Sequence, residues 1–148
     1  MRIEVLRFEQ LSNYQLYDLL KLRSDIFVVE QNCVYGDMDG RDISAVHVLL
    51  YDRDVLQAYL RVFLHEDGTV RLGRVVSRTR GKGYGQAVLK HGIRTAEELF
   101  DAEEIVIEAQ VYAAGFYGMQ GFRIDSEEFL KDGIPHVRMV RRKAELPD

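Results

Sequence analysis

The sequence predicts an α+β fold in which a mixed sheet of about seven strands carries helices on both faces. Strand-like and helix-like patterns alternate along the chain in the order β-α-β-β-β-α-β-α-β-β, which is typical of such a sheet. The length of 148 residues suits one domain, residues 1–148, with one sizeable core. Apolar residues make up 47% of the chain and charged residues 30%, the balance of an ordinary globular protein.

The first elements follow from alternation and from a helix-start signal. Residues 2–8 alternate between apolar and polar side chains, as a strand does. Ser12 begins a predicted helix with Gln15 as its capping-box partner, and the apolar face of this helix continues to Phe27. Residues 31–42 are polar and predict an irregular loop with glycines at its turns.

Turn residues separate the next strands. Residues 45–51 and 55–64 predict a hairpin, and a second turn leads into a strand over residues 69–76. After a glycine-rich loop, a long helix is expected up to Phe100. Gly92 inside it costs about 1 kcal/mol relative to alanine and argues against an unbroken helix.

The last third of the chain predicts a strand, a short helix and a hairpin. Residues 104–110 have the apolar pattern of a strand. Residues 122–130 and 136–142 predict the two strands of the hairpin, which an Asp-Gly turn joins. The tail after Lys143 is expected to be frayed.

The glycine-rich loop over residues 80–85 is the most informative functional signal. Its glycines let several backbone N–H groups approach one bound group, and the helix that follows offers a first turn that attracts phosphate. The candidate ligand-binding residues are Arg80, Gly81, Lys82, Gly83, Tyr84, Gly85 and Gln86. A tight turn without a ligand is the alternative. The G-x-G-x-x-G spacing of dinucleotide-binding folds and the P-loop pattern do not occur in the sequence.

A second motif follows the loop in a characteristic order. A strand and a short helix lead into the sequence Phe-Tyr-Gly-Met-Gln-Gly-Phe over residues 116–122. The order strand, R-x-x-G-x-G, helix, strand, short helix, F-Y-x-x-x-G-F resembles the GNAT superfamily of acetyl-CoA-dependent N-acetyltransferases. Residues 27–33, 35–40 and 132–136 resemble its ElaA-like branch, so that the likeness spans nearly the whole chain.

This resemblance implies a GNAT-like acyl-CoA N-acyltransferase fold and direct transfer of an acetyl group from acetyl-CoA to an amine of a small molecule, peptide or protein. It implies that the glycine loop holds the pyrophosphate of coenzyme A and that a backbone N–H near Val75 or Val76 stabilises the thioester oxygen. Tyr117 matches the tyrosine that gives a proton to the departing thiolate. Its alternative role is that of a half-buried ring covering the cofactor channel.

The group that removes a proton from the amine is not defined by the resemblance. Some relatives carry Glu or His on the strand before the glycine loop, but Val70 and Leu72 occupy the matching positions here. The remaining candidates are His136, Glu108, Glu30, His47 and a chain of water molecules. His136 is favoured because an imidazole titrates at about pH 6.5. A histidine that only makes a hydrogen bond at the start of a strand fits the sequence equally well.

Acidic residues around the loop over residues 31–42 suggest a site for the amine. They are Glu30, Asp37, Asp39 and Asp42. Either they form a solvated turn, or they form a wall that attracts a cation; Glu30 and Glu108 are the candidate substrate-binding residues. The calcium and zinc patterns are incomplete, so no metal is expected. Cys33 is the single cysteine, which excludes an internal disulfide, and nothing in its neighbourhood indicates an activated thiol.

The composition excludes several classes of function. Lys plus Arg total 20 and Asp plus Glu total 24, so the net charge is −4 and offers no general attraction for nucleic acid. No apolar run approaches the roughly 20 residues that cross a bilayer, and the first residues do not form a signal peptide. A cytoplasmic protein is expected. Because single-domain relatives often pair, a homodimer is a possible assembly.

Two other classes of function stay open. A non-catalytic acyl-CoA-binding sensor would keep Arg80, Gly83 and Gly85 but would need neither Tyr117 nor a base. A nucleotide-binding regulatory domain would bind NAD or ATP more tightly than acetyl-CoA. The presence of Tyr117 favours the enzyme.

Overall fold

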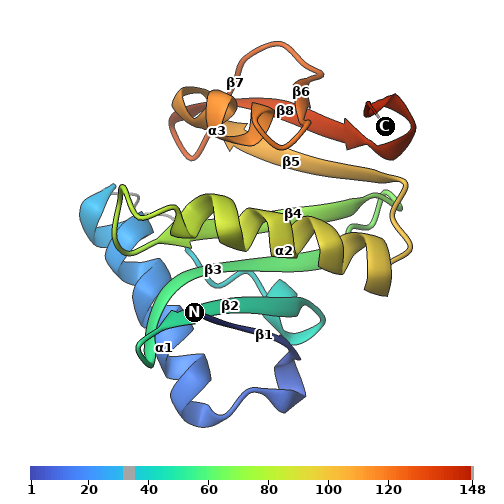
Figure 1. Ribbon diagram of the computed structural model, residues 1–148. Helices are drawn as coiled ribbons and strands as arrows, with labels where there is room; N and C mark the ends of the chain where they lie inside the picture. The colour runs from blue at the N-terminus through green and yellow to red at the C-terminus, as the bar shows by residue number, and fades with distance from the viewer. Residues whose placement is uncertain (32–35, 148) are drawn as a thin grey trace.

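Figure 1 shows the computed structural model, which describes residues 1–31 and 36–147. The strands of the described residues are β1 (Arg2–Arg7), β2 (Val46–Asp52), β3 (Val55–Leu64), β4 (Val70–Ser77), β5 (Glu104–Gln110), β6 (Arg123–Ile124), β7 (Phe129–Lys131) and β8 (Ile134–Arg142). The helices are α1 (Asn13–Arg23), α2 (Tyr84–Leu99) and α3 (Ala114–Gly118), with a π-helix, η2 (Ser24–Glu30). Short 3₁₀ turns are η1 (Phe8–Gln10), η3 (Arg41–Ile43), η4 (Val111–Ala113) and η5 (Lys143–Glu145).

These strands form one mixed sheet in the order β1-β2-β3-β4-β5-β8-β6, with β7 also paired to β8. Each pair is antiparallel except β4 with β5, which is parallel. Helix α2 packs on one face of the sheet and α1 on the other. The predicted mixed sheet with helices on both faces is confirmed.

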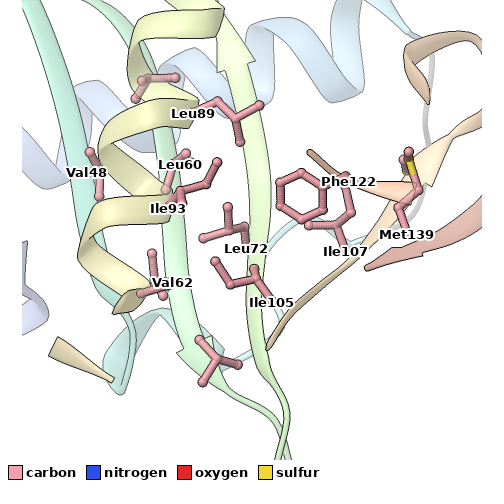
Figure 2. Packing of buried hydrophobic residues seen from close by; sticks show 14 of the residues in the cluster. Val48, Leu60, Val62, Leu72, Leu89, Ile93, Ile105, Ile107, Phe122 and Met139 are labelled. Carbon is pink, nitrogen blue, oxygen red and sulfur yellow. The ribbon is translucent and has the colours of Figure 1, made fainter. Parts of the chain in front are cut away.

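The larger core lies between α2 and the sheet. In Figure 2, Leu89 and Ile93 of α2 face Leu60 and Leu72 of the central strands, and all four are buried. Helix α2 is unbroken at Gly92, contrary to the doubt that its glycine raised. A Cβ at Gly92 would lie 2.6 Å from Leu60 Cδ2, so glycine allows the helix to approach the sheet closely.

Helix α1 begins as predicted and ends earlier. Gln15 donates its backbone N–H to Ser12 Oγ at 3.0 Å, and Ser12 donates its own to Gln15 Oε1 at 3.0 Å, which confirms the capping box. The α-helix stops at Arg23 instead of continuing to Phe27, and the chain goes on as the π-helix η2. Single π-helical turns are frequent at functional sites, and η2 lies beside the cavity described below.

Two predictions for the C-terminal region are wrong. Residues 122–130 form two short strands, β6 and β7, instead of one, because a polar segment leaves the sheet between them. Arg138 on β8 donates its backbone N–H to Ser126 Oγ at 2.9 Å, in the place of a strand carbonyl. The tail after Lys143 is held by η5 and is not frayed at its start, where Lys143 N–H donates to Glu103 O at 2.9 Å.

β4 and β5 pair only at their first residues. Val70 lies opposite Ile105 and Arg71 opposite Val106, and no further pairs follow although both strands continue. The pairing between β3 and β4 also contains a bulge, in which two β4 residues lie opposite the single residue Leu60. Bulges bend and twist a strand. β4 and β5 therefore separate and leave a gap in the middle of the sheet.

Candidate active site

A cavity of about 290 Å³ lies where β4 and β5 separate. Arg61 and Phe63 of β3 line it, whereas the alternate residues Leu60 and Val62 face α2. Phe27 of η2 forms part of the opposite wall. The cavity therefore opens on the sheet face that carries α1 and η2, away from α2.

The bulge of β4 brings Val75 to this cavity. Arg74 has a φ of +53°, uncommon for a residue other than glycine, and the strand turns at this point. Val75 lines the cavity, whereas Val76 is buried in the smaller core beneath α1. Of the two valines named from the sequence, Val75 is thus the one beside the gap.

The glycine loop lies at the same gap on the α2 face, because it follows the end of β4 and the first turn of α2 contacts Phe116, which follows β5. Gly81 and Gly83 both have a φ of +77°, and no atom lies within 4 Å of where their Cβ atoms would be. Ala87 N–H donates to Gly83 O at 3.0 Å as the first bond inside α2, so the N–H groups of residues 84–86 have no partner within the helix. The loop offers open space and three helix-end donors, the arrangement that suits a phosphate.

Two side chains after the loop are already engaged with the protein. The Tyr84 hydroxyl donates to Asp52, and the Gln86 amide donates to Phe116 O at 3.1 Å. A Cβ on Gly85 would lie 3.1 Å from the Phe116 ring, so this glycine has a packing reason of its own. Residues 84–86 can therefore offer a ligand chiefly their backbone N–H groups.

The charged groups of the loop lie at the surface. Arg80 and Lys82 are exposed. Arg80 donates to Glu30 at the end of η2, with 2.9 Å between Nη2 and Oε1. Glu30 does not line the cavity, so the structure places this candidate substrate residue beside the glycine loop instead.

Tyr117 lies at the junction of the cavity and α3. Its ring packs edge-on against Phe116 and Phe122, with ring centroids 5.1 Å and 6.0 Å away. Burial raises the pKa of the Tyr117 hydroxyl above its ordinary value, and the neighbouring Tyr112 acts in the same direction. The hydroxyl is thus protonated at neutral pH and can donate.

His136 is buried at the start of β8 and lines the cavity. Its Nδ1 lies 2.7 Å from Ile134 O, and because a carbonyl only accepts, Nδ1 carries the hydrogen. In the neutral ring the lone pair therefore belongs to Nε2. The imidazole stacks on Phe129 of β7, with 6.1 Å between centroids.

Comparison with known proteins agrees with this arrangement. The family described as "Acetyltransferase (GNAT) domain" matches residues 25–143. The chain belongs to this GNAT acetyltransferase family. Protein ElaA of Escherichia coli K12 is 37% identical over 142 residues, which cover 92% of this chain and 93% of ElaA. The likeness to the ElaA-like branch is confirmed.

Solved structures agree on the GNAT fold. The crystal structure of Escherichia coli ElaA superimposes with a TM-score of 0.88 at 35% identity, covering 95% of this chain and 99% of ElaA. An acyl-CoA N-acyltransferase from Pseudomonas aeruginosa gives a TM-score of 0.88 at 34% identity, with coverage of 95% and 99%. An aminoglycoside 6'-N-acetyltransferase complexed with coenzyme A, at 15% identity, full coverage of both chains and a TM-score of 0.71, shares the fold alone.

The GNAT positions that can carry a base on the strand before the loop are apolar here. Val70 and Leu72 are buried in the core. His47, a further candidate, is buried with both nitrogens occupied: Nδ1 lies 2.6 Å from the Tyr59 hydroxyl and Nε2 2.9 Å from Asp42 O. Burial lowers the pKa of His47, so this histidine is a neutral part of the core.

Glu108 lines the cavity as an ion-paired carboxylate. Arg71 Nη1 lies 3.1 Å from its Oε1, and Lys131 Nζ lies 2.8 Å from its Oε2. Burial works to raise the pKa of Glu108, but the hydrogen bond from Lys131 and the charges of both cations outweigh it, so this pKa is lowered. A carboxylate held in this way is a weak proton acceptor, and each of its oxygens already faces one cation.

In the described part of the acidic loop, residues 36–42, the aspartates are already paired with cations of the protein itself. Its three aspartates form ion pairs with three arginines: Asp37 and Asp42 with Arg23, Asp39 and Asp42 with Arg61, and Asp37 with Arg74. Three negative and three positive charges balance. Arg23, Arg61 and Asp42 are buried, whereas Asp39 is exposed, so the network runs from the interior to the surface.

The roles of these arginines were not predicted from the sequence. A signal was present: Arg23 follows Leu19 by four residues, on the apolar face of α1, and Arg61 lies within an apolar strand. A charged side chain on an apolar face needs an oppositely charged partner when it is buried. The carboxylates of the acidic loop were available as such partners.

The described residues were also searched for metal sites and for membrane-spanning helices. Within residues 1–31 and 36–147, no three His, Cys, Asp or Glu side chains are grouped as a metal site, and no helix is long and apolar enough to cross a membrane. Cys33 lies outside the described residues.

Proposed function

We propose that this GNAT protein is an acetyl-CoA-dependent N-acetyltransferase that transfers the acetyl group directly to a primary amine of a small molecule, peptide or protein. The observation that carries the proposal is the gap between β4 and β5. A glycine loop suited to phosphate meets it from one face, and a cavity with Tyr117 and His136 meets it from the other.

The residues of the glycine loop fit the pyrophosphate of coenzyme A. The N–H groups of residues 84–86 lack partners in α2, and Gly81 and Gly83 leave the space before them open. Arg80 and Lys82 add positive charge. Bound acetyl-CoA supplies the acetyl group, and a backbone N–H at the β4 bulge, at Val75 or Val76, stabilises the charge on its oxygen. Fixed dipoles in a water-poor site are far more effective than the same dipoles in water.

Tyr117 is the proposed general acid. Its raised pKa keeps the hydroxyl protonated, and it lies at the cavity where a departing thiolate would need a proton. The role of a covering ring would use only its packing against Phe116 and Phe122.

His136 is the proposed general base, directly or through water. Its Nδ1–H is committed to Ile134 O, which leaves the Nε2 lone pair for a proton from the amine. Glu108 instead binds the amine as a cation. Glu30 stays a candidate for substrate binding, and the cytoplasmic location and homodimer expected from the sequence stay part of the proposal.

Native mass spectrometry with acetyl-CoA and an amine library tests the proposal. We expect a bound acyl-CoA and an acetylated amine. Binding without any acetylated amine would favour the non-catalytic sensor, and tighter binding of NAD or ATP would overturn the proposal.

A pH–rate series tests the base. The kcat/KM of the wild type should rise with pH as an imidazole loses its proton. His136→Asn keeps an N–H for Ile134 O but has no base, so it should lose this limb while remaining folded. An unchanged limb in His136→Asn would assign the proton to a water chain.

A further inference from the structure

Lys131 has an unusual place among the lysines of this protein. The chain has five lysines, all within the described residues, and Lys131 alone lines the cavity. We infer that Lys131 is an acetyl acceptor within its own molecule, so that the enzyme modifies itself at the ε-amine of this residue. This modification rests on the proposed function, because bound acetyl-CoA supplies the acetyl group.

The hairpin of β7 and β8 carries both Lys131 and the proposed base His136. Asp132 and Gly133 have φ values of +53° and +76°, the left-handed pair of a tight two-residue turn. Lys131 pairs with Ile134 across this turn, and the carbonyl of Ile134 orients His136. A short, regular hairpin therefore keeps Lys131 and His136 in one fixed relation.

Glu108 keeps the ammonium of Lys131 at the cavity. β8 lies between β5 and β7 in the sheet, so the side chain of Lys131 reaches across β8 to place Nζ 2.8 Å from Glu108 Oε2. The ion pair of Lys131 and Glu108 thus links the end of β7 to β5, which lines the cavity. The amine of Lys131 thus occupies the kind of position that an external acceptor amine must reach.

The other four lysines lie elsewhere, and three of them, Lys21, Lys90 and Lys143, serve as internal controls. Lys21 pairs with Asp25 along α1, Lys82 belongs to the glycine loop on the opposite face, and Lys90 is exposed on α2. Lys143 lies in η5. Unassisted chemical acetylation would modify these exposed amines as readily as Lys131.

The transfer balances without a further reactant. An ammonium loses one proton to Nε2 of His136, and the lone pair of Nζ forms a bond to the acetyl carbonyl carbon. The bond between that carbon and sulfur breaks, and the hydroxyl of Tyr117 gives a proton to the thiolate. The nitrogen, which still carries one hydrogen more than the amide product, loses this second proton, and that proton restores the Tyr117 hydroxyl. The products are an N-acetyl-lysine, free coenzyme A and one proton, which passes to solvent after His136 and Tyr117 regain their starting states.

Acetylation would change the cavity. An amide carries no charge, so Glu108 would keep Arg71, at 3.1 Å, and lose its second cation. Its Oε2 would then face the cavity and attract an incoming ammonium. Self-acetylation would therefore convert an occupied amine position into an open one.

Peptide mapping by mass spectrometry tests the inference. The full-length protein is incubated with acetyl-CoA, and the acetylated fraction is followed at all five lysines. We expect acetylation at Lys131 at least tenfold faster than at Lys21, Lys90 or Lys143, with a rate constant independent of protein concentration. Tyr117→Phe should lower the Lys131 rate at least tenfold, and Lys131→Arg, which can still pair with Glu108, should remove the modified peptide.

NMR of the lysine side chains supplies a second measurement, which does not require transfer of the acetyl group. With lysine labelled at Cε, a ketone analogue of acetyl-CoA that cannot donate its acyl group should shift the Lys131 signal and leave Lys21 and Lys143 in place. If the analogue binds and added amines are acetylated while Lys131 stays unmodified and unshifted, the inference is overturned and the proposed function stands. If the analogue does not bind at all, both fail. Equal rates at all five lysines would also overturn the inference.

Discussion

The glycine loop and the acidic loop approach one gap from opposite faces of the sheet, and they are held in different ways. The glycine loop uses backbone groups, exposed cations and the end of one helix. The acidic loop is held by side-chain charges from α1, β3 and β4, most of them buried. One side of the gap thus offers donors to an anion, whereas the described part of the acidic loop presents carboxylates that are already paired with arginines.

This difference assigns separate tasks to the two loops. Backbone donors recognise a phosphate and nothing else about the ligand, so the glycine loop suits a constant cosubstrate. The carboxylates of the acidic loop are already neutralised by arginines, so they offer little net charge to an incoming amine. The charge that meets an acceptor amine must come from groups outside the acidic loop, of which Glu108 lines the cavity.

The largest effect is expected where the buried network loses one charge. Asp42 accepts from Arg23 at 2.7 Å and from Arg61 at 2.9 Å. Asp42→Asn keeps the shape and leaves two buried guanidinium groups short of one carboxylate, so it should lower the free energy of unfolding by about 3–5 kcal/mol. Urea unfolding measures this. Glu66→Gln, at the exposed pair with Arg41, is the control and should change the free energy of unfolding far less, because solvent screens that pair.

The pH dependence of the free energy of unfolding, compared between the wild type and Asp42→Asn, tests the same ion pairs further. Burial works to raise the pKa of Asp42, but the hydrogen bond and charge of Arg23 outweigh it, so the pKa in the folded state lies below the ordinary value. Its contribution to stability is present above the unfolded pKa of about 3.9 and is lost as pH falls through the folded pKa. The wild type should therefore lose its advantage over Asp42→Asn below about pH 4. A constant difference down to pH 2 would contradict this account.

Tyr117→Phe should have the largest effect on turnover. General acid groups contribute about 10²–10⁴ in rate, and phenylalanine keeps the ring that packs on Phe116 and Phe122. We expect kcat to fall in this range while acetyl-CoA affinity and thermal stability stay the same. Tyr112→Phe, which removes the hydroxyl of an exposed neighbour, is the matched control. Equal kcat in both variants, with chemistry rate-limiting, would return Tyr117 to the role of a covering ring.

Sequence patterns contained within single segments were enough to predict most of the strands and helices and the glycine loop. Residues 55–64 and 104–110 were predicted with the bounds that β3 and β5 have, because their alternation and turns are contained in the segment itself. Residues 122–130 were mispredicted because Ser126 bonds to β8, a partner that the segment does not contain. The roles of Asp37, Asp39 and Asp42 were missed for the same reason: their arginines come from three distant elements.

The glycine loop can be tested with two variants of equal size. Asp and Asn both tolerate the left-handed conformation of Gly83, and both fit the N-terminal end of α2. Asp adds a negative charge that favours the helix end but repels a phosphate. Gly83→Asp should therefore be at least as stable as Gly83→Asn yet bind acetyl-CoA at least about tenfold more weakly, or 1.4 kcal/mol. Equal affinities by calorimetry would argue against phosphate binding at this loop.

The smallest effect concerns Glu30, which the sequence assigned to the acceptor and the structure places on Arg80. Both side chains are largely exposed, so their pair is worth about 0.2–1 kcal/mol at most. Glu30→Gln releases Arg80 for a phosphate and should tighten acetyl-CoA binding by about 1.4- to 5-fold, less so at high salt. The KM for the amine should not change. Asp54→Asn, at the remote exposed pair with Arg2, should alter neither value. A raised KM for the amine with unchanged acetyl-CoA affinity would restore Glu30 to the acceptor side and show that η2 moves toward the cavity when the amine binds.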